Sequence, residues 1–139
     1  MSIVYSDIAV YLRDLLQEEL ADVEVTIEPD IFGENLLDEV GIRLSAQKNE
    51  EAYLGASDPY RSTLEYKVIC SVWHPDGVLE AYRKRDSLIE RVTAILKTDR
   101  TLGGKVGSTQ LGDFDFDFMR NESGYFCAGI ITLSVFDIS

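Results

Sequence analysis

The sequence has one histidine, two cysteines and no apolar run long enough to cross a membrane. With only His74 available, a histidine-based metal cluster is excluded, because such a site needs a second imidazole. Cys70 and Cys127 both lie in apolar, strand-like runs, so we expect buried, reduced thiols. The opening residues lack the basic and apolar regions of a secretory signal, which favours synthesis and folding in the cytosol.

Basic residues are also scarce, with 13 lysines and arginines against 25 acidic residues and a formal net charge of -12. Such a surface repels a phosphate backbone unless a local basic patch overrides it. The cluster Arg83, Lys84 and Arg85 is diluted by acidic neighbours and is typical of a solvated helix face. Specific nucleic-acid binding is therefore disfavoured, whereas a protein past which DNA slides without being held is compatible with the charge.

The motifs of catalysis are missing as well. There is no Gly-x-Ser-x-Gly elbow, and the glycines from Gly103 to Gly107 lack the spacing of a phosphate-binding loop. Three aspartates, Asp113, Asp115 and Asp117, alternate with phenylalanine and lack the turn glycine of a calcium loop. We therefore predict no catalytic residue, no cofactor and no metal, and a protein that is not an enzyme.

The chain has 139 residues, of which 45% are hydrophobic, and this predicts a single domain over residues 1–139. Alternation of apolar and polar residues predicts strands. From Thr63 to Trp73 one face is apolar and the second is half polar, and from Asp113 to Phe118 three phenylalanines oppose three aspartates. A turn at 121–124 then predicts a closing antiparallel hairpin. The remaining predicted strands are Val23–Ile27, Glu39–Ser45 and Tyr125–Ile138.

Apolar residues at helical spacing predict two helices. The first begins at Ser6, a candidate N-cap, and reaches Leu20; the second follows Asp76, another candidate N-cap, and carries an apolar stripe to Leu96. The order of helix, strands, helix, strands predicts an α+β fold, in which the two helices pack on one face of a mainly antiparallel sheet.

The segment after the second helix reads Leu96-Lys97-Thr98-Asp99-Arg100-Thr101-Leu102-Gly103-Gly104-Lys105-Val106. Thr101 and Leu102 can close the helix end, Gly103 and Gly104 can reverse the chain, and Val106 can re-enter the sheet. This segment resembles the D-x-T-L-G-G-x-V pattern common among tail terminator (tail completion) proteins of long-tailed bacteriophages. The opening helix with its short strand and the long C-terminal strand are similar to that family too, so the resemblance covers nearly the whole chain.

The resemblance implies a structural virion protein of the tail or neck region, assembled in the host cytoplasm. Members of the family form a ring, usually a hexamer, that caps the finished tail tube, ends its polymerisation and joins it to the neck. The implied partners are further copies of the chain, the tail tube protein and a neck or head-completion protein, with no membrane. A lumen lined by carboxylates would repel DNA phosphates and let the genome pass without specific binding.

Two sets of residues are candidates for these contacts. Ile69 and Trp73, on the half-polar face of the Thr63–Trp73 strand, are candidates for a subunit interface. The polar stretch from Ala46 to Ser62 is predicted to be a long loop, and loops of this length are usually functional or mobile. Its candidates for contact with the tube protein or the lumen are Glu50, Glu51, Tyr53, Leu54 and Tyr60.

Two other functions are compatible with the sequence. A head-completion or neck connector protein would share the acidity and the lack of catalytic motifs. A small ligand-binding domain, with its pocket between the sheet and the helices, would be a monomer or dimer whose melting temperature rises with a metabolite.

Overall fold

The computed structural model describes residues 5–27, 38–51, 60–122 and 124–138. Within these ranges the chain forms two helices and a five-stranded sheet with the strand order β1-β2-β3-β5-β4, which confirms the predicted α+β class. The elements in chain order are α1 (Tyr5–Glu19), β1 (Glu24–Ile27), β2 (Glu39–Glu51), β3 (Tyr60–His74), α2 (Val78–Thr98), β4 (Val106–Asn121) and β5 (Gly124–Ile138).

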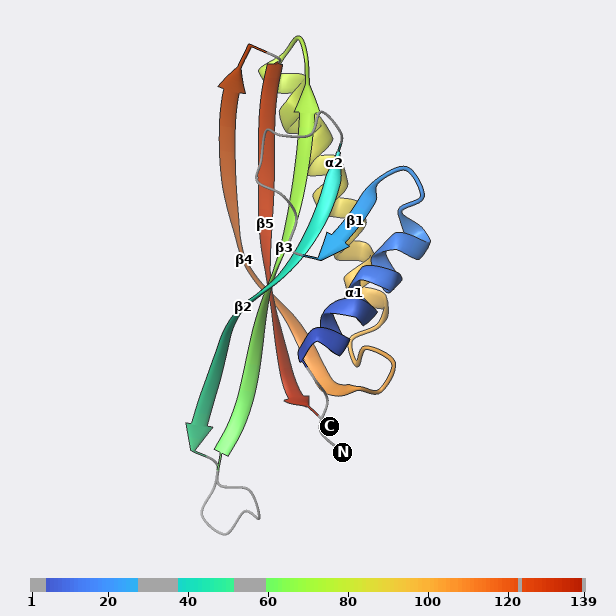
Figure 1. Cartoon of the computed structure of the whole chain (residues 1–139), viewed down its shortest axis with the longest axis vertical. Coiled ribbons are helices and arrows are strands. Elements are labelled where there is room, and N and C mark those ends of the chain that lie inside the picture. Colours follow the sequence, from blue (N-terminus) through green and yellow to red (C-terminus); the bar gives the residue numbers. More distant parts are fainter. Residues whose placement is uncertain (1–4, 28–37, 52–59, 123, 139) are drawn as a thin grey trace.

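The sheet is antiparallel except at one edge. There the short strand β1 runs parallel to β2 and pairs with it only from Glu39 to Ile42. The other three pairs, β2–β3, β3–β5 and β4–β5, are antiparallel and long. The strands twist strongly, so that the sheet narrows to a waist in Figure 1. The predicted closing hairpin is confirmed as the β4–β5 pair.

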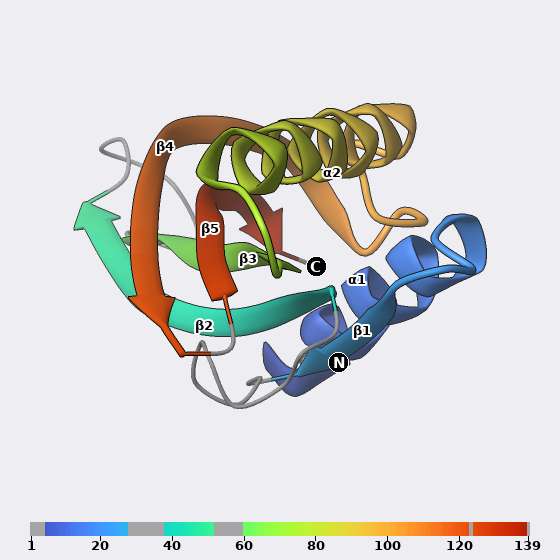
Figure 2. The same ribbon diagram turned by 90° about the horizontal axis from the view of Figure 1, so that it is seen from above.

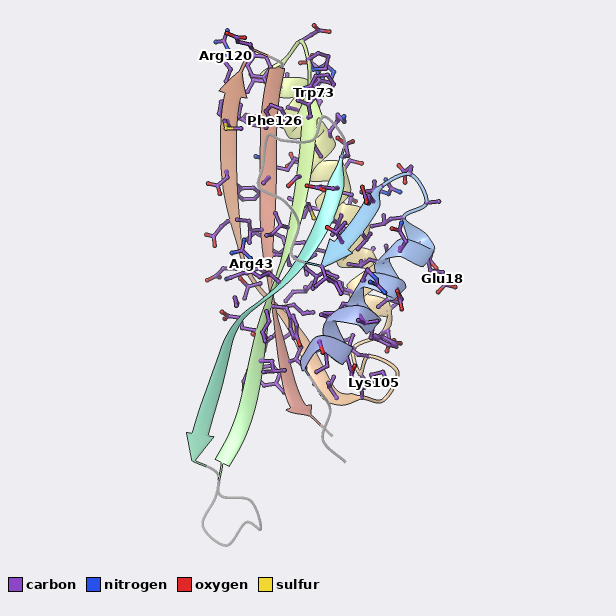
Figure 3. All side chains as sticks on the ribbon, viewed as in Figure 1. Glu18, Arg43, Trp73, Lys105, Arg120 and Phe126 are labelled. Atoms are coloured by element: carbon purple, nitrogen blue, oxygen red, sulfur yellow. The ribbon has the colours of Figure 1, made fainter. Side chains whose placement is uncertain are left out.

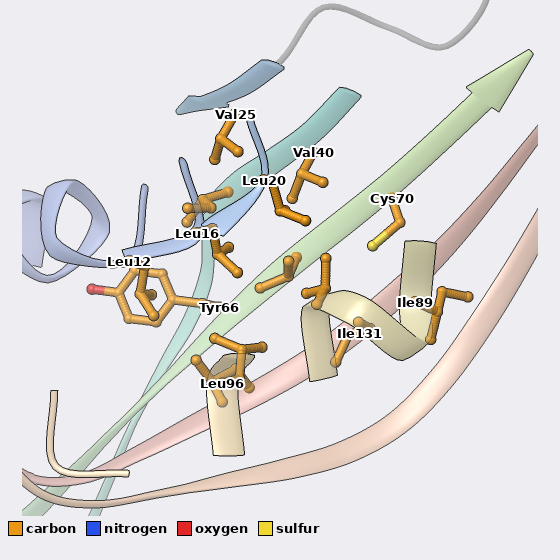
Figure 4. Packing of buried hydrophobic residues seen from close by; sticks show 14 of the residues in the cluster. Leu12, Leu16, Leu20, Val25, Val40, Tyr66, Cys70, Ile89, Leu96 and Ile131 are labelled. Carbon is orange, nitrogen blue, oxygen red and sulfur yellow. The ribbon is translucent and has the colours of Figure 1, made fainter. Parts of the chain in front are cut away.

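Both helices lie on one face of the sheet, as the view from above in Figure 2 shows. The alternation of β3 determines which side chains they cover, because Leu64, Tyr66 and Val68 point toward the helices and are fully buried. Figure 4 shows Tyr66 in the core with side chains from both helices and from neighbouring strands, such as Leu12, Leu96 and Ile131. No helix in the described ranges is long and apolar enough to cross a membrane. We call the opposite, helix-free side of the sheet the open face.

The helix starts differ from the prediction. α1 begins at Tyr5, so Ser6 lies inside the helix rather than at its N-cap. The N-cap of α2 is Gly77, and no side chain bonds there, so Asp76 does not cap that helix. At the other end of α1 a side chain does organise the chain: the Gln17 amide donates to the carbonyl of Val23 and accepts from the N–H of Val25. This pair of bonds holds β1 beside α1.

The predicted loop from Ala46 to Ser62 is wrong in its bounds. β2 continues to Glu51 and β3 begins at Tyr60, with those two residues paired in register. We call this end of the hairpin, residues 46–51 with 60–65, the arm; it extends away from the helices in Figure 1. The polar composition of the arm does not reveal its strand pairing. A strand ladder is held by backbone hydrogen bonds, which polar residues form as well as apolar ones.

Candidate assembly surface

The longest strand, β4, lies at an edge of the sheet (Figure 1). It pairs with β5 on one side, and within the described chain no strand lies on its other side. The outward backbone groups of β4 therefore have no sheet partner among the described residues of one copy. Such an edge is a template for another strand, and proteins usually shorten, cover or charge it.

One face of this edge carries three exposed phenylalanines. Phe114, Phe116 and Phe118 point to the helix side of the sheet and are 41%, 54% and 46% exposed. They remain partly exposed because α2 packs on β3 and β5, and its Tyr82 and Arg85 side chains reach only Phe118 and Phe116. Large apolar side chains gathered on one strand are a feature of interaction sites rather than of solvated edges.

Aromatic and cationic contacts from α2 hold part of this ladder in place. The Arg85 guanidinium lies 4.7 Å from the ring centre of Tyr82 and 4.5 Å from that of Phe116. Tyr82 also meets Phe118 edge to face, with ring centres 5.9 Å apart. The solvated helix face predicted at Arg85 is wrong for this residue, because its side chain is only 15% exposed. The guanidinium is attracted to the faces of both rings, which stabilises the position of Phe116 beside α2.

The other face of the same strand is acidic. Asp115 and Asp117 stand opposite Ile130 and Ala128 on the open face, and Asp113 precedes them past a register shift in the β4–β5 pairing. All three are exposed, and none of their carboxylates forms an ion pair or hydrogen bond with the described residues. The described residues contain no group of acidic, histidine or cysteine side chains that could hold a metal ion. The edge of β4 is thus apolar toward the helices and negatively charged on the open face.

The predicted subunit-interface residues, Ile69 and Trp73, lie on the open face, away from the helices. Ile69 stands opposite Ile130, while Trp73 packs against Phe126 with ring centres 6.5 Å apart (Figure 3). The indole N–H of Trp73 is buried without a hydrogen-bond partner in the described structure. Both side chains are partly exposed, so a neighbour could contact them, and their role as an interface stays a prediction.

The structure separates the members of the predicted contact loop. Glu50 and Glu51 belong to β2 and Tyr60 to β3, at the end of the arm. Tyr53 and Leu54 lie outside the described residues. The tube-contact or lumen role of these five residues stays a prediction, now attached to the end of a β-hairpin.

The helix-end turn has the geometry that its glycines predict. α2 ends at Thr98, and the next residues include three with left-handed backbone, Leu102, Gly103 and Gly104. Leu102 is buried despite its positive φ of 49°, so its side chain anchors the turn in the core. The N–H of Val106 then bonds the carbonyl of Thr101 where β4 begins. Thr101 and Leu102 were predicted to close the helix end, but the C-cap is Asp99, and both residues lie in the turn beyond it. Gly103 and Gly104, predicted to reverse the chain, have the left-handed backbone that such a turn uses.

This turn also attaches α1 to the rest of the fold. The Tyr11 hydroxyl donates to one carboxylate oxygen of Asp99, and the N–H of Gly103 donates to the other at 3.0 Å. The Tyr11 hydrogen bond, followed by that of Gly103, lowers the pKa of Asp99, and the same carboxylate raises the pKa of Tyr11. A substituent on Gly103 would meet the Tyr11 ring, which explains the glycine at that position.

The two thiols are buried, and the histidine takes part in a turn. Burial raises the pKa of Cys70 to about 12 and also raises that of Cys127, so both thiols stay protonated near neutral pH. Their predicted burial is confirmed. The His74 ring accepts a hydrogen bond from the N–H of Asp76 and closes the turn before α2.

No protein-family model matches the chain, and no curated protein is significantly similar to it. The edge of β4 and the turn after α2 are the features from which a function can be argued.

Proposed function

We propose that this protein forms a closed ring, a hexamer by its family resemblance, that caps the tail tube of a long-tailed bacteriophage. The ring ends tube polymerisation and joins the tail to the neck. The observation that carries the proposal is the edge of β4, long and unpaired in the described chain, with an apolar ladder on one face and free carboxylates on the other. A protein that works alone gains nothing from such an edge, whereas a subunit needs one.

The turn from Asp99 to Val106 gives the second support. Its pattern resembles that of tail terminator proteins, and several of its residues have a defined structural role. Leu102 anchors the turn, Gly103 admits Tyr11, and Val106 starts β4. The motif therefore fixes both α1 and the beginning of the edge strand.

The charge and the arm fit the same function. A net charge of -12 repels DNA, so a ring of such subunits would let a genome pass through its lumen without holding it. The arm extends away from the helices and presents backbone that could meet the tube protein. A ring subunit needs these two separate surfaces, one for its neighbours and one for the tube.

The proposal can be tested by assembly on tail tubes of the virus that encodes this chain. Light scattering over a range of protein concentrations gives the mass of the free protein, and electron microscopy gives the place of binding and the tube length. We expect a ring, either free or formed on the tube, that binds one tube end and stops its growth. Binding on the portal side instead would favour a neck connector.

A ligand-binding domain has one observation in its favour. A pocket of about 380 Å³ opens between the end of α2 and β4, lined by Leu96, Lys97, Arg100, Thr109, Gln110, Leu111 and Leu133. The Arg100 guanidinium already bonds the Thr109 carbonyl across it. Two results would support ligand binding over the ring. The protein would stay a monomer or dimer that does not bind tubes at any concentration, and its melting temperature would rise with a metabolite.

A further inference from the structure

The described sheet has a second open edge, on β2. β1 covers the outer side of β2 only from Glu39 to Ile42. From Arg43 to Glu51 β2 pairs with β3 on its inner side, and no described strand lies on its outer side. The two open edges, on β4 and on β2, are therefore at opposite ends of the strand order.

The first residues of this β2 edge have the opposite character to β4. Leu44 stands opposite Tyr66 on the helix side and is 37% exposed. Arg43 stands opposite Lys67 on the open face, where it is exposed and forms no ion pair with the described residues (Figure 3). At Arg43 and Leu44 the edge of β2 is thus apolar toward the helices and carries a positive charge on the open face.

We infer that β4 of one copy pairs with this outer edge of β2 in a second copy, so that one sheet continues from subunit to subunit. In such a pairing the faces match: Phe114 to Phe118 meet Leu44 on the helix side, and Asp115 and Asp117 meet Arg43 on the open face. The inference rests on the proposed function in that it supplies the subunit contact of the ring.

The same charges select this contact over a symmetric one. Two β4 edges brought together would place one row of aspartates beside another, and like charges directly opposite are unfavourable. Pairing of β4 with β4 of a second copy is therefore unfavourable, whereas pairing with an edge that carries a cation is favourable. A contact between two different edges repeats head to tail, and it closes into a ring when the rotation between subunits allows it.

Charge reversal on each edge tests the pairing. One variant carries Arg43→Glu, and the other carries both Asp115→Arg and Asp117→Arg. The control carries Glu19→Arg and Glu90→Arg, two exposed helix residues, and so has the same net charge as the β4 variant. Light scattering and sedimentation of the purified proteins give the concentration at half-assembly, and thermal melting shows that each variant folds.

We expect each edge variant to need at least about tenfold more protein for half-assembly than the wild type, while the control stays close to it. An equimolar mixture of the two edge variants should assemble again. In an alternating ring, the arginines introduced on β4 of one variant meet the carboxylate introduced at position 43 of the other at every second contact. The remaining contacts are those of the wild type. A misfolded chain could not give this rescue.

Three results would overturn the inference: normal assembly of either edge variant, no rescue on mixing, or a wild-type chain that stays monomeric at every concentration and forms no ring on tubes. Tube capping separates this outcome from failure of the proposed function. If the edge variants still form rings and cap tubes, the β4–β2 contact is wrong but the proposed function stands. If charge reversal breaks the wild-type ring and mixing restores it, but the ring does not bind tubes, the β4–β2 contact stands and the proposed function is wrong.

Discussion

At position 129 in β5, the lack of a side chain lets α2 approach the sheet. A Cβ placed there would lie 2.2 Å from Cδ1 of Ile89 and 2.9 Å from its Cγ1, well inside contact distance. Cγ of Arg85 is 3.7 Å from the same point. A glycine weakens a strand by itself, so its presence in β5 is explained by the helix that crosses it. The same close approach helps Arg85 to reach Phe116.

Gly129→Ala should therefore destabilise the fold by about 1–3 kcal/mol, because Ile89 is buried and has little room to move. Urea unfolding measures the change. Gly112→Ala is the matched control, since its nearest neighbour would be the Thr132 carbonyl oxygen at 3.5 Å, an ordinary contact. Adding Ile89→Val to the first variant removes Cδ1 and should recover part of the loss. Equal costs at both glycines would contradict this account of the packing.

At the scale of elements, the turn after α2 connects α1 to the edge strand through hydrogen bonds. Tyr11→Phe removes the hydroxyl that donates to Asp99 and should lower the free energy of unfolding by about 1 kcal/mol near neutral pH. Denaturant unfolding measures this, with Tyr82→Phe as a control that keeps its ring contacts with Arg85 and Phe118. A loss as large in the control would show that the hydroxyl of Tyr11 has no special role.

The pH dependence of this connection has a definite sign. The pKa of Asp99 in the folded chain lies below its ordinary value of 3.8, so the stabilisation is present above that value. It is lost as the pH falls through the folded-state pKa. The gap in stability between the wild type and Tyr11→Phe should therefore narrow on acidification below about pH 4. A gap that stays constant down to acid unfolding would mean that the Asp99 carboxylate is not the partner.

Sequence patterns predicted the elements well where side-chain periodicity is strong. The faces of β3 and the hairpin of β4 with β5 follow from alternation, and the turn at Gly103 follows from its glycines. The arm could not be predicted in this way, because the pairing of Glu51 with Tyr60 depends on the register of the hairpin and produces no apolar pattern in the sequence. Helix starts such as Gly77 failed because the prediction relied on a side-chain cap that is absent here.

The assembly surface was half predictable. The strict alternation from Asp113 to Phe118 separates an apolar and an acidic face, which the sequence shows directly. That the apolar face is exposed depends on the position of β4 at the sheet edge and on the reach of α2, and both are properties of the tertiary fold. The stacking of Arg85 on Phe116 depends on the same packing, so composition around Arg85 indicated a solvated cluster instead.

At the scale of the whole molecule, the two open edges carry opposite charges, at Arg43 on β2 and at Asp115 and Asp117 on β4, while the chain as a whole is strongly acidic. Copies with a net charge of -12 repel one another at long range, and this repulsion is screened by salt. Association therefore requires short-range contacts that are specific in position, such as an apolar ladder and a local ion pair. This combination favours a single ordered contact over non-specific aggregation, which a ring of defined size requires.

The end of the arm is the candidate surface for contact with the tube protein. Because Glu51 and Tyr60 are paired, residues 52–59 can be replaced by Asn-Gly, a sequence suited to a two-residue hairpin turn. We expect the shortened chain to keep its melting temperature and its ring but to lose tube capping, since Tyr53 and Leu54 are removed. A Glu50→Gln, Glu51→Gln variant with the full hairpin separates the carboxylates from these two residues. If the shortened chain capped tubes as the wild type does, the tube contact would have to lie elsewhere, and the open face around Ile69 and Trp73 would be the next surface to change.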